Sequence, residues 1–144
     1  MMIVRNEVSV KEKKNIISVI KNDLQSEREV RFAYLHGSFL RGKFNDIDIG
    51  IYFSSPDSDY IYKKKRLDFE LKKEVGLSKK VGFKVDVRCL NDAPNNFCYN
   101  VIKDGELLFS DDESLRSDFE SLVLVKHHDF QRYRKRYRKK AIGV

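Results

Sequence analysis

The run of residues 46–53 (Asp-Ile-Asp-Ile-Gly-Ile-Tyr-Phe) constrains the fold more than any other part of the sequence. Apolar residues alternate with others, which predicts a strand with one buried face. Asp46 and Asp48 then project from its opposite face. A turn explains Asp46, because Asn-Asp favours turns, but it leaves Asp48 between two isoleucines unexplained. Neighbouring carboxylates repel, and a divalent cation relieves that repulsion, so the pair predicts a site for hard-ligand ions such as magnesium.

A second strand, residues 83–89, carries one further carboxylate in the same kind of pattern. Asp86 lies between Val85 and Val87. Taken alone, Asp86 also fits a strand with one solvated face. If the two strands are neighbours, however, three carboxylates converge, and three are enough to hold a pair of metal ions.

A glycine follows the strand predicted at residues 30–35 and precedes a short turn. Gly37 lets the backbone approach a ligand closely, and amides at a helix start, here at Ser38, attract phosphate. Arg41 and Lys43 add positive charge nearby. We therefore predict nucleotide binding by Gly37, Ser38 and Arg41. Taken one by one, the glycine also fits an ordinary turn, and the two basic residues also fit surface charges.

Helices are predicted between and after the strands. Ser9 and Glu12 form a capping box that predicts a helix to about residue 25. Pro94 opens a short helix that ends before Gly105, and residues 106–109 form a brief strand. A second capping box, residues 110–113, precedes a long helix with apolar positions at Leu115, Phe119, Leu122, Phe130, Tyr133 and Tyr137.

The helix predicted after the break at residues 54–58 is highly charged. Its apolar residues Tyr60, Leu67, Leu71 and Val75 predict one buried face, and Gly76 predicts its end. Helices and strands therefore alternate along the chain, which predicts a sheet covered by helices. With 144 residues, we expect a single domain spanning residues 1–144.

The basic charge is concentrated in the tail, residues 126–144. Residues 126–140 include eight Lys or Arg residues and one Asp. Their net charge of +7 equals that of the whole chain. Tyr133 and Tyr137 interrupt the basic run. Three interpretations remain open: a docking surface for a partner protein, a nucleic-acid-binding segment, and a solvated helix end.

Cys89 and Cys98 lack disulfide or metal spacing, and we expect them to be buried thiols. His36, His127 and His128 also lack metal spacing. The sequence has no signal-peptide pattern and no apolar run of membrane-spanning length. We therefore expect no membrane association and a cytoplasmic location.

The order of these motifs resembles the DNA polymerase β-like nucleotidyltransferase superfamily. Its signature is Gly-Ser, a spacer, Asp-x-Asp on the next strand, and a later strand with a third Asp. The matching residues are Gly37-Ser38, Asp46-Ile-Asp48 and Lys84-Val-Asp86. The spacer is shorter than in many relatives, with Asn45 where they have Ser.

The resemblance extends to the minimal antitoxin subgroup called MntA. Matching features are residues 90–94 (Leu-Asn-Asp-Ala-Pro), residues 105–109 (Gly-Glu-Leu-Leu-Phe) and the aromatic-basic residues 129–134. The resemblance implies an α+β fold, a small mixed sheet flanked by helices with a long C-terminal helix. It also implies that Asp46, Asp48 and Asp86 are catalytic and bind two Mg2+ ions, with ATP as substrate.

By the same resemblance, the acceptor is a HEPN-family RNase toxin held in a hetero-oligomeric complex. A tyrosine hydroxyl of the toxin receives AMP, which silences it. This implication favours partner docking as the role of the basic tail, with nucleic acid second. Two alternatives are a nucleotidyltransferase acting on a small molecule such as an aminoglycoside, and a non-catalytic binding module.

Overall fold

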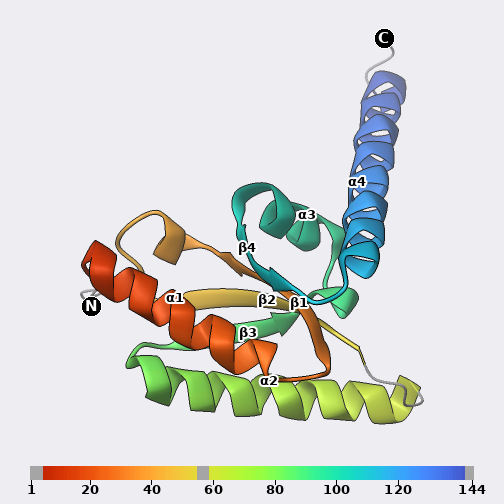
Figure 1. The fold of residues 1–144 in the computed structure, drawn as a ribbon. Helices are drawn as coiled ribbons and strands as arrows, with labels where there is room; N and C mark the ends of the chain where they lie inside the picture. Colours follow the sequence, from red (N-terminus) through yellow and green to blue (C-terminus); the bar gives the residue numbers. More distant parts are fainter. Residues whose placement is uncertain (1–4, 55–58, 142–144) are drawn as a thin grey trace.

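In the part of the chain that the structure describes, four strands form one mixed sheet in the order β3-β2-β1-β4 (Figure 1). The computed structural model describes residues 5–54 and 59–141. The strands are β1 (Val30–His36), β2 (Ile47–Phe53), β3 (Val85–Cys89) and β4 (Glu106–Ser110). β2 and β3 are parallel, whereas β1 is antiparallel to both β2 and β4. Each strand lies within two residues of its predicted position.

Within these described ranges, four helices cover the sheet, as the alternation of elements predicts. They are α1 (Val10–Gln25), α2 (Asp59–Val81), α3 (Asn95–Asp104) and α4 (Glu113–Ala141). Two single turns of 3-10 helix, η1 (Ser38–Leu40) and η2 (Leu90–Asp92), follow β1 and β3. The α+β class and the long C-terminal helix are confirmed.

The two faces of the sheet bury separate apolar clusters, and this decides where the carboxylates lie. Ile47, Ile49 and Ile51 of β2 join the larger cluster, which α1 and α2 complete with residues such as Ile20 and Leu77. The smaller cluster, on the face covered by α3 and α4, contains Phe32, Tyr34, Leu90, Cys98, Val101 and Val123. Because side chains alternate along a strand, Asp48 points to the face of the smaller cluster.

α1 forms as the sequence predicts. The Ser9 hydroxyl accepts a hydrogen bond from the backbone N–H of Glu12 at 3.1 Å, which satisfies one free amide at the helix start. Ile16, Ile20 and Leu24 are buried at helical spacing.

The predicted buried face of α2 was wrong. Tyr60, Leu67, Leu71 and Val75 are all at least half exposed, and the helix continues through Gly76 to Val81. The face turned towards the sheet carries Leu77 together with polar residues that bond to the protein. Lys73, for example, is 9% exposed and pairs with Asp23 at 2.9 Å and Glu27 at 2.6 Å.

The capping of α4 differs from the prediction. Asp112 caps the helix by accepting the backbone N–H of Leu115 at 3.0 Å, a role that the sequence assigned to Ser110. The first half of α4 is anchored to the sheet, because the Phe119 ring packs on Phe32 and the Tyr34 hydroxyl donates to Glu120. None of the described helices is long and apolar enough to cross a membrane.

Candidate active site

Asp46, Asp48 and Asp86 meet at one edge of the sheet. Asp46 lies immediately before β2, whereas Asp48 and Asp86 are register partners in the parallel pairing of β2 with β3. One carboxylate oxygen from each residue lies within 4.8 Å of the other two. The predicted convergence of the three carboxylates is therefore present in the fold.

Burial and neighbouring carboxylates disfavour the ionised forms of Asp48 and Asp86. Burial, then the charges of Asp86 and Asp46, raise the pKa of Asp48 to about 6. Burial and Asp46 also raise the pKa of Asp86, and the nearby Lys84 partly offsets this effect. Lys84 lies 3.9 Å from Asp46. Concentrated negative charge and hard oxygen donors fit a divalent cation such as magnesium.

Gly37 lies directly against Asp48. Its φ of +85° falls in the left-handed region, which side chains other than glycine rarely adopt. A Cβ atom at this position would also come within 2.3 Å of the Asp48 Oδ2 atom. Both the backbone conformation and the carboxylate therefore require a glycine at the end of β1.

The other predicted nucleotide-binding residues follow Gly37 along the chain. Ser38 is the first residue of η1, and its carbonyl accepts the backbone N–H of Arg41 at 2.9 Å. Ser38, Arg41 and Lys43 are all exposed. Their contacts with phosphate stay predictions, because they concern a ligand.

The site opens into a cavity of about 600 Å³. Its lining residues are His36, Asp48, Ile49, Glu70, Glu74, Asp86, Val87, Arg88 and Phe97. The Arg88 guanidinium lies 4.3 Å from the Phe97 ring centroid, and the His36 ring meets the same phenyl group edge-on at 5.5 Å. Burial and the charge of Arg88 lower the pKa of His36, so its imidazole is neutral near neutral pH.

Arg88 and Phe97 were not among the residues singled out from the sequence. Arg88 follows Asp86 by two residues, so strand periodicity alone was enough to place both side chains on one face. Phe97 was predicted to lie on a helix, but nothing in the sequence indicated that this helix crosses the carboxylate face.

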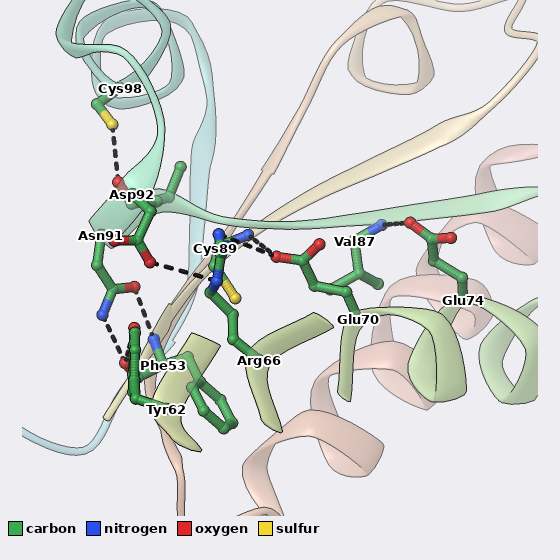
Figure 2. Close-up of polar contacts among 11 residues, drawn as sticks. Phe53, Tyr62, Arg66, Glu70, Glu74, Val87, Cys89, Asn91, Asp92 and Cys98 are labelled. Carbon is green, nitrogen blue, oxygen red and sulfur yellow. Dashed lines mark hydrogen bonds and ion pairs between the residues drawn. The ribbon is translucent and has the colours of Figure 1, made fainter. Parts of the chain in front are cut away.

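Three side chains of α2 accept hydrogen bonds from the backbone along the outer edge of β3. Ser78 Oγ accepts the N–H of Val85 at 2.9 Å, and Glu74 Oε1 accepts the N–H of Val87 at 3.0 Å. Glu70 Oε1 accepts the N–H of Cys89 at 3.2 Å, and Figure 2 shows the two glutamates reaching the strand from successive helical turns. These bonds satisfy edge donors and fix the strand that carries Asp86.

Further polar contacts continue this edge into η2 (Figure 2). The Asn91 side chain accepts the N–H of Phe53 at 3.0 Å and donates to its carbonyl, which joins η2 to the end of β2. Arg66 of α2 pairs with Asp92 at 3.4 Å and lies 3.9 Å from Glu70. η2, which follows the strand that carries Asp86, is therefore bonded to β2 on one side and to α2 on the other.

The two cysteines are core residues, as predicted. Cys89 and Cys98 are both buried, and burial raises the pKa of each thiol, so both stay protonated. Cys98 donates to the carbonyl of Leu90 at 3.2 Å. His127 stacks on Tyr99, which agrees with a structural role for this histidine.

Comparison with known proteins gives one family match. Residues 18–114 match the family described as polymerase beta, nucleotidyltransferase. This segment includes all three aspartates, Gly37 and the whole sheet. None of the curated proteins matches the sequence.

Several crystal structures are similar to this chain over nearly its whole length. The toxin–antitoxin MntA–HepT matches with a TM-score of 0.58 and 17% identity, covering 93% of this chain and 99% of the matched chain. A toxin–antitoxin structure with AMP-PNP matches with a TM-score of 0.61 and 20% identity, covering 90% and 98%. A tri-AMPylated Shewanella oneidensis HEPN toxin in complex with MNT antitoxin matches with a TM-score of 0.58 and 20% identity, covering 92% and 97%. At these identities the similarity establishes the fold.

Proposed function

The chain belongs to the polymerase β nucleotidyltransferase family, and we propose that it transfers AMP from ATP to a tyrosine hydroxyl of a HEPN-family toxin and so neutralises the toxin. The observation that carries this proposal is the meeting of Asp46, Asp48 and Asp86 beside Gly37. This arrangement joins a cation-binding group to a close backbone approach, and nucleotidyl transfer needs both.

Magnesium would be held by Asp46, Asp48 and Asp86. When bound, two such ions stabilise the charge that develops on the attacking and leaving oxygens of an in-line displacement. The carboxylates fit this role because burial and the charges of its two neighbours make ionised Asp48 costly at neutral pH, and a bound cation would offset this cost.

The remaining steps fall to residues of this chain. Gly37 and Ser38 hold the β- and γ-phosphates through their backbone, and Arg41 adds positive charge at the end of η1. Asp86 accepts the proton of the acceptor hydroxyl. The hydroxyl oxygen forms a bond to the α-phosphorus, the bond between that phosphorus and the bridging oxygen breaks, and pyrophosphate leaves.

A protein acceptor is supported by the similar structures. One contains an AMPylated HEPN toxin with an MNT antitoxin, and another contains AMP-PNP. This chain covers at least 97% of each matched chain, so the likeness extends beyond the catalytic sheet. We infer a hetero-oligomeric complex with the toxin, in the cytoplasm.

Intact mass spectrometry tests this function. The protein encoded by the neighbouring gene, tested as the candidate toxin, is incubated with this protein, ATP and magnesium, and we expect its mass to increase by one or more AMP units. Asp48→Ala must abolish the increase, whereas Asp118→Ala, which removes an exposed carboxylate on α4, must leave it unchanged. Peptide mapping then identifies the modified residue.

Two results contradict the proposal. An unchanged toxin mass in a stable complex indicates inhibition by contact. AMP transfer to an aminoglycoside without any protein partner indicates a small-molecule enzyme.

A further inference from the structure

The outer half of α4 has an aromatic stripe that packs against neither of the two apolar clusters formed by the described residues. Residues 128–138 are all exposed, and Figure 1 shows this part of the helix standing away from the sheet. Phe130, Tyr133 and Tyr137 are 55%, 65% and 65% exposed. Their spacing of three and four residues places all three rings on one face of the helix.

This stripe continues the face by which α4 packs on the sheet. Phe119 packs on Phe32 and Tyr52, and the spacing from Phe119 through Lys126 to Phe130 is helical. The inner half of the face is covered by the sheet, and among residues 5–54 and 59–138 nothing covers the outer half, where the three rings are more than half exposed. Most helical stability in proteins comes from packing of an amphipathic face, and a partner that covers the outer half would supply this packing.

The surface beside the stripe is hollowed where α4 meets α3. One cavity of about 480 Å³ is lined by Asn95, Asn96, Lys126, His127 and Phe130. A second cavity, of about 260 Å³, includes Asn95, Leu122 and Lys126 in its lining. Leu122 is 53% exposed. The two cavities share Asn95 and Lys126 and together form what we call the α3–α4 groove, and Phe130 joins this groove to the stripe.

α3 connects this groove to the active site. Asn95 and Asn96 line the groove, whereas Phe97, the next residue, lines the carboxylate cavity. A partner seated in the groove is therefore separated from the site by a single helix. This proximity favours the acceptor itself as the occupant.

The basic residues beside the stripe indicate which kind of partner fits it. Helical geometry places Arg134 on one side of the stripe and Arg136 on the other, and the Arg134 guanidinium lies 5.9 Å from the Phe130 ring. A second copy would bring two strongly basic helices together. Nucleic acid would bind to the basic side chains. Most of these lie away from the aromatic stripe and would leave it uncovered.

We propose that the α3–α4 groove and the aromatic stripe of Phe130, Tyr133 and Tyr137 dock an apolar helical surface of the acceptor protein, rimmed by acidic residues that pair with Arg134 and Arg136. This inference rests on the proposed function and adds the surface by which the acceptor is recognised. Helix packing supplies the affinity, and the flanking arginines set orientation.

The test measures binding and transfer with the full chain and the protein encoded by the neighbouring gene, the candidate acceptor. Phe130→Glu/Tyr133→Glu places acidic groups on the stripe and should weaken binding about 30-fold or more, as expected for loss of interface hot spots. Arg134→Glu/Arg136→Glu should also weaken it, with a reduced dependence on salt. Leu71→Glu, on the exposed face of α2, is the matched control and should bind like the wild type. Circular dichroism and AMP-PNP affinity check that fold and site are intact.

The outcomes separate this inference from the proposed function. If the Phe130→Glu/Tyr133→Glu variant binds and modifies the toxin like the wild type, the docking surface is wrong and the function stands. If only the Leu71→Glu variant loses binding, the interface is on α2 and the proposed docking surface is wrong. Loss of binding to a single-stranded RNA, with toxin binding unchanged, makes the stripe a nucleic-acid site. If the wild type neither binds nor modifies the toxin, both the proposed function and the proposed docking surface are wrong.

Discussion

The Glu74 carboxylate accepts the backbone N–H of Val87 at 3.0 Å, which ties α2 to the strand that carries Asp86. Val87 follows Asp86 directly, and β3 is at the edge of the sheet, where its outer N–H groups have no strand beside them in the part of the chain that the structure describes. The helix side chain therefore takes the place of a missing strand beside the carboxylate cluster.

Replacing Glu74 tests this support. Glu74→Ala leaves a partly buried N–H without its acceptor, which we expect to lower the free energy of unfolding by about 1–3 kcal/mol. Glu74→Gln keeps an acceptor oxygen and should recover most of the stability. If the bond also positions Asp86, Glu74→Ala should raise the magnesium concentration needed for half-maximal transfer, and Glu74→Gln should restore it.

The control for Glu74 is Asp68→Ala, which removes an exposed carboxylate from the same helix. It should leave both stability and magnesium dependence unchanged. Equal magnesium dependence in Glu74→Ala and the wild type would limit the role of Glu74 to stability.

Gly37→Ala should abolish activity, whereas the matched control Gly82→Ala should remain active. A left-handed backbone costs a residue with a side chain about 1–2 kcal/mol, and the added Cβ would also meet Asp48 at 2.3 Å. Gly82 has nearly the same φ, +80°, but its Cβ would meet no atom of the described residues within 4 Å. Thermal unfolding should therefore show a loss in both variants, whereas the transfer assay should fail only for Gly37→Ala. Full activity in Gly37→Ala would show that Asp48 tolerates displacement.

Asp23 should make stability depend on acid pH. Burial alone would raise its pKa, but hydrogen bonds from Lys80 and Lys73 outweigh burial and hold the pKa below its usual value. A lowered pKa gives stability that is complete above about pH 4, and this stability is lost as the pH falls through the folded-state pKa. Asp23→Asn should lower the unfolding free energy by about 1–2 kcal/mol at neutral pH, because it leaves part of a shielded ion pair unmatched.

Urea unfolding at several pH values checks the prediction for Asp23. The difference between Asp23→Asn and the wild type should shrink as the pH falls well below 4, where Asp23 is protonated in both states. Glu7→Gln, at an exposed position, should show no such difference. A difference that persists unchanged into strong acid would exclude the ion pairs as its source.

Sequence periodicity predicted the strands and the carboxylate face but not the packing of α2. Strict alternation along residues 46–53 was enough to place Asp46 and Asp48 on the same side of the sheet. The same reasoning failed for Leu67, Leu71 and Val75, because the inward face of α2 is selected by hydrogen bonding as well as by burial. Glu70, Glu74 and Ser78 bond to β3, a requirement that depends on which strand lies at the edge of the sheet.

Asp48→Asn should stabilise the metal-free protein while it weakens the metal site. Burial and the charges of Asp86 and Asp46 raise the pKa of Asp48 to about 6, so its ionised form opposes folding at neutral pH. Removing that charge should raise the unfolding free energy in EDTA by about 1 kcal/mol, after allowance for solvent screening of a half-exposed group. Magnesium should then stabilise the wild type more than the variant, because ligand stabilisation follows affinity. Differential scanning calorimetry with and without magnesium measures both effects, with Asp118→Asn as the exposed control. A variant less stable than the wild type in EDTA would mean that hydrogen bonding by Asp48 outweighs its repulsion.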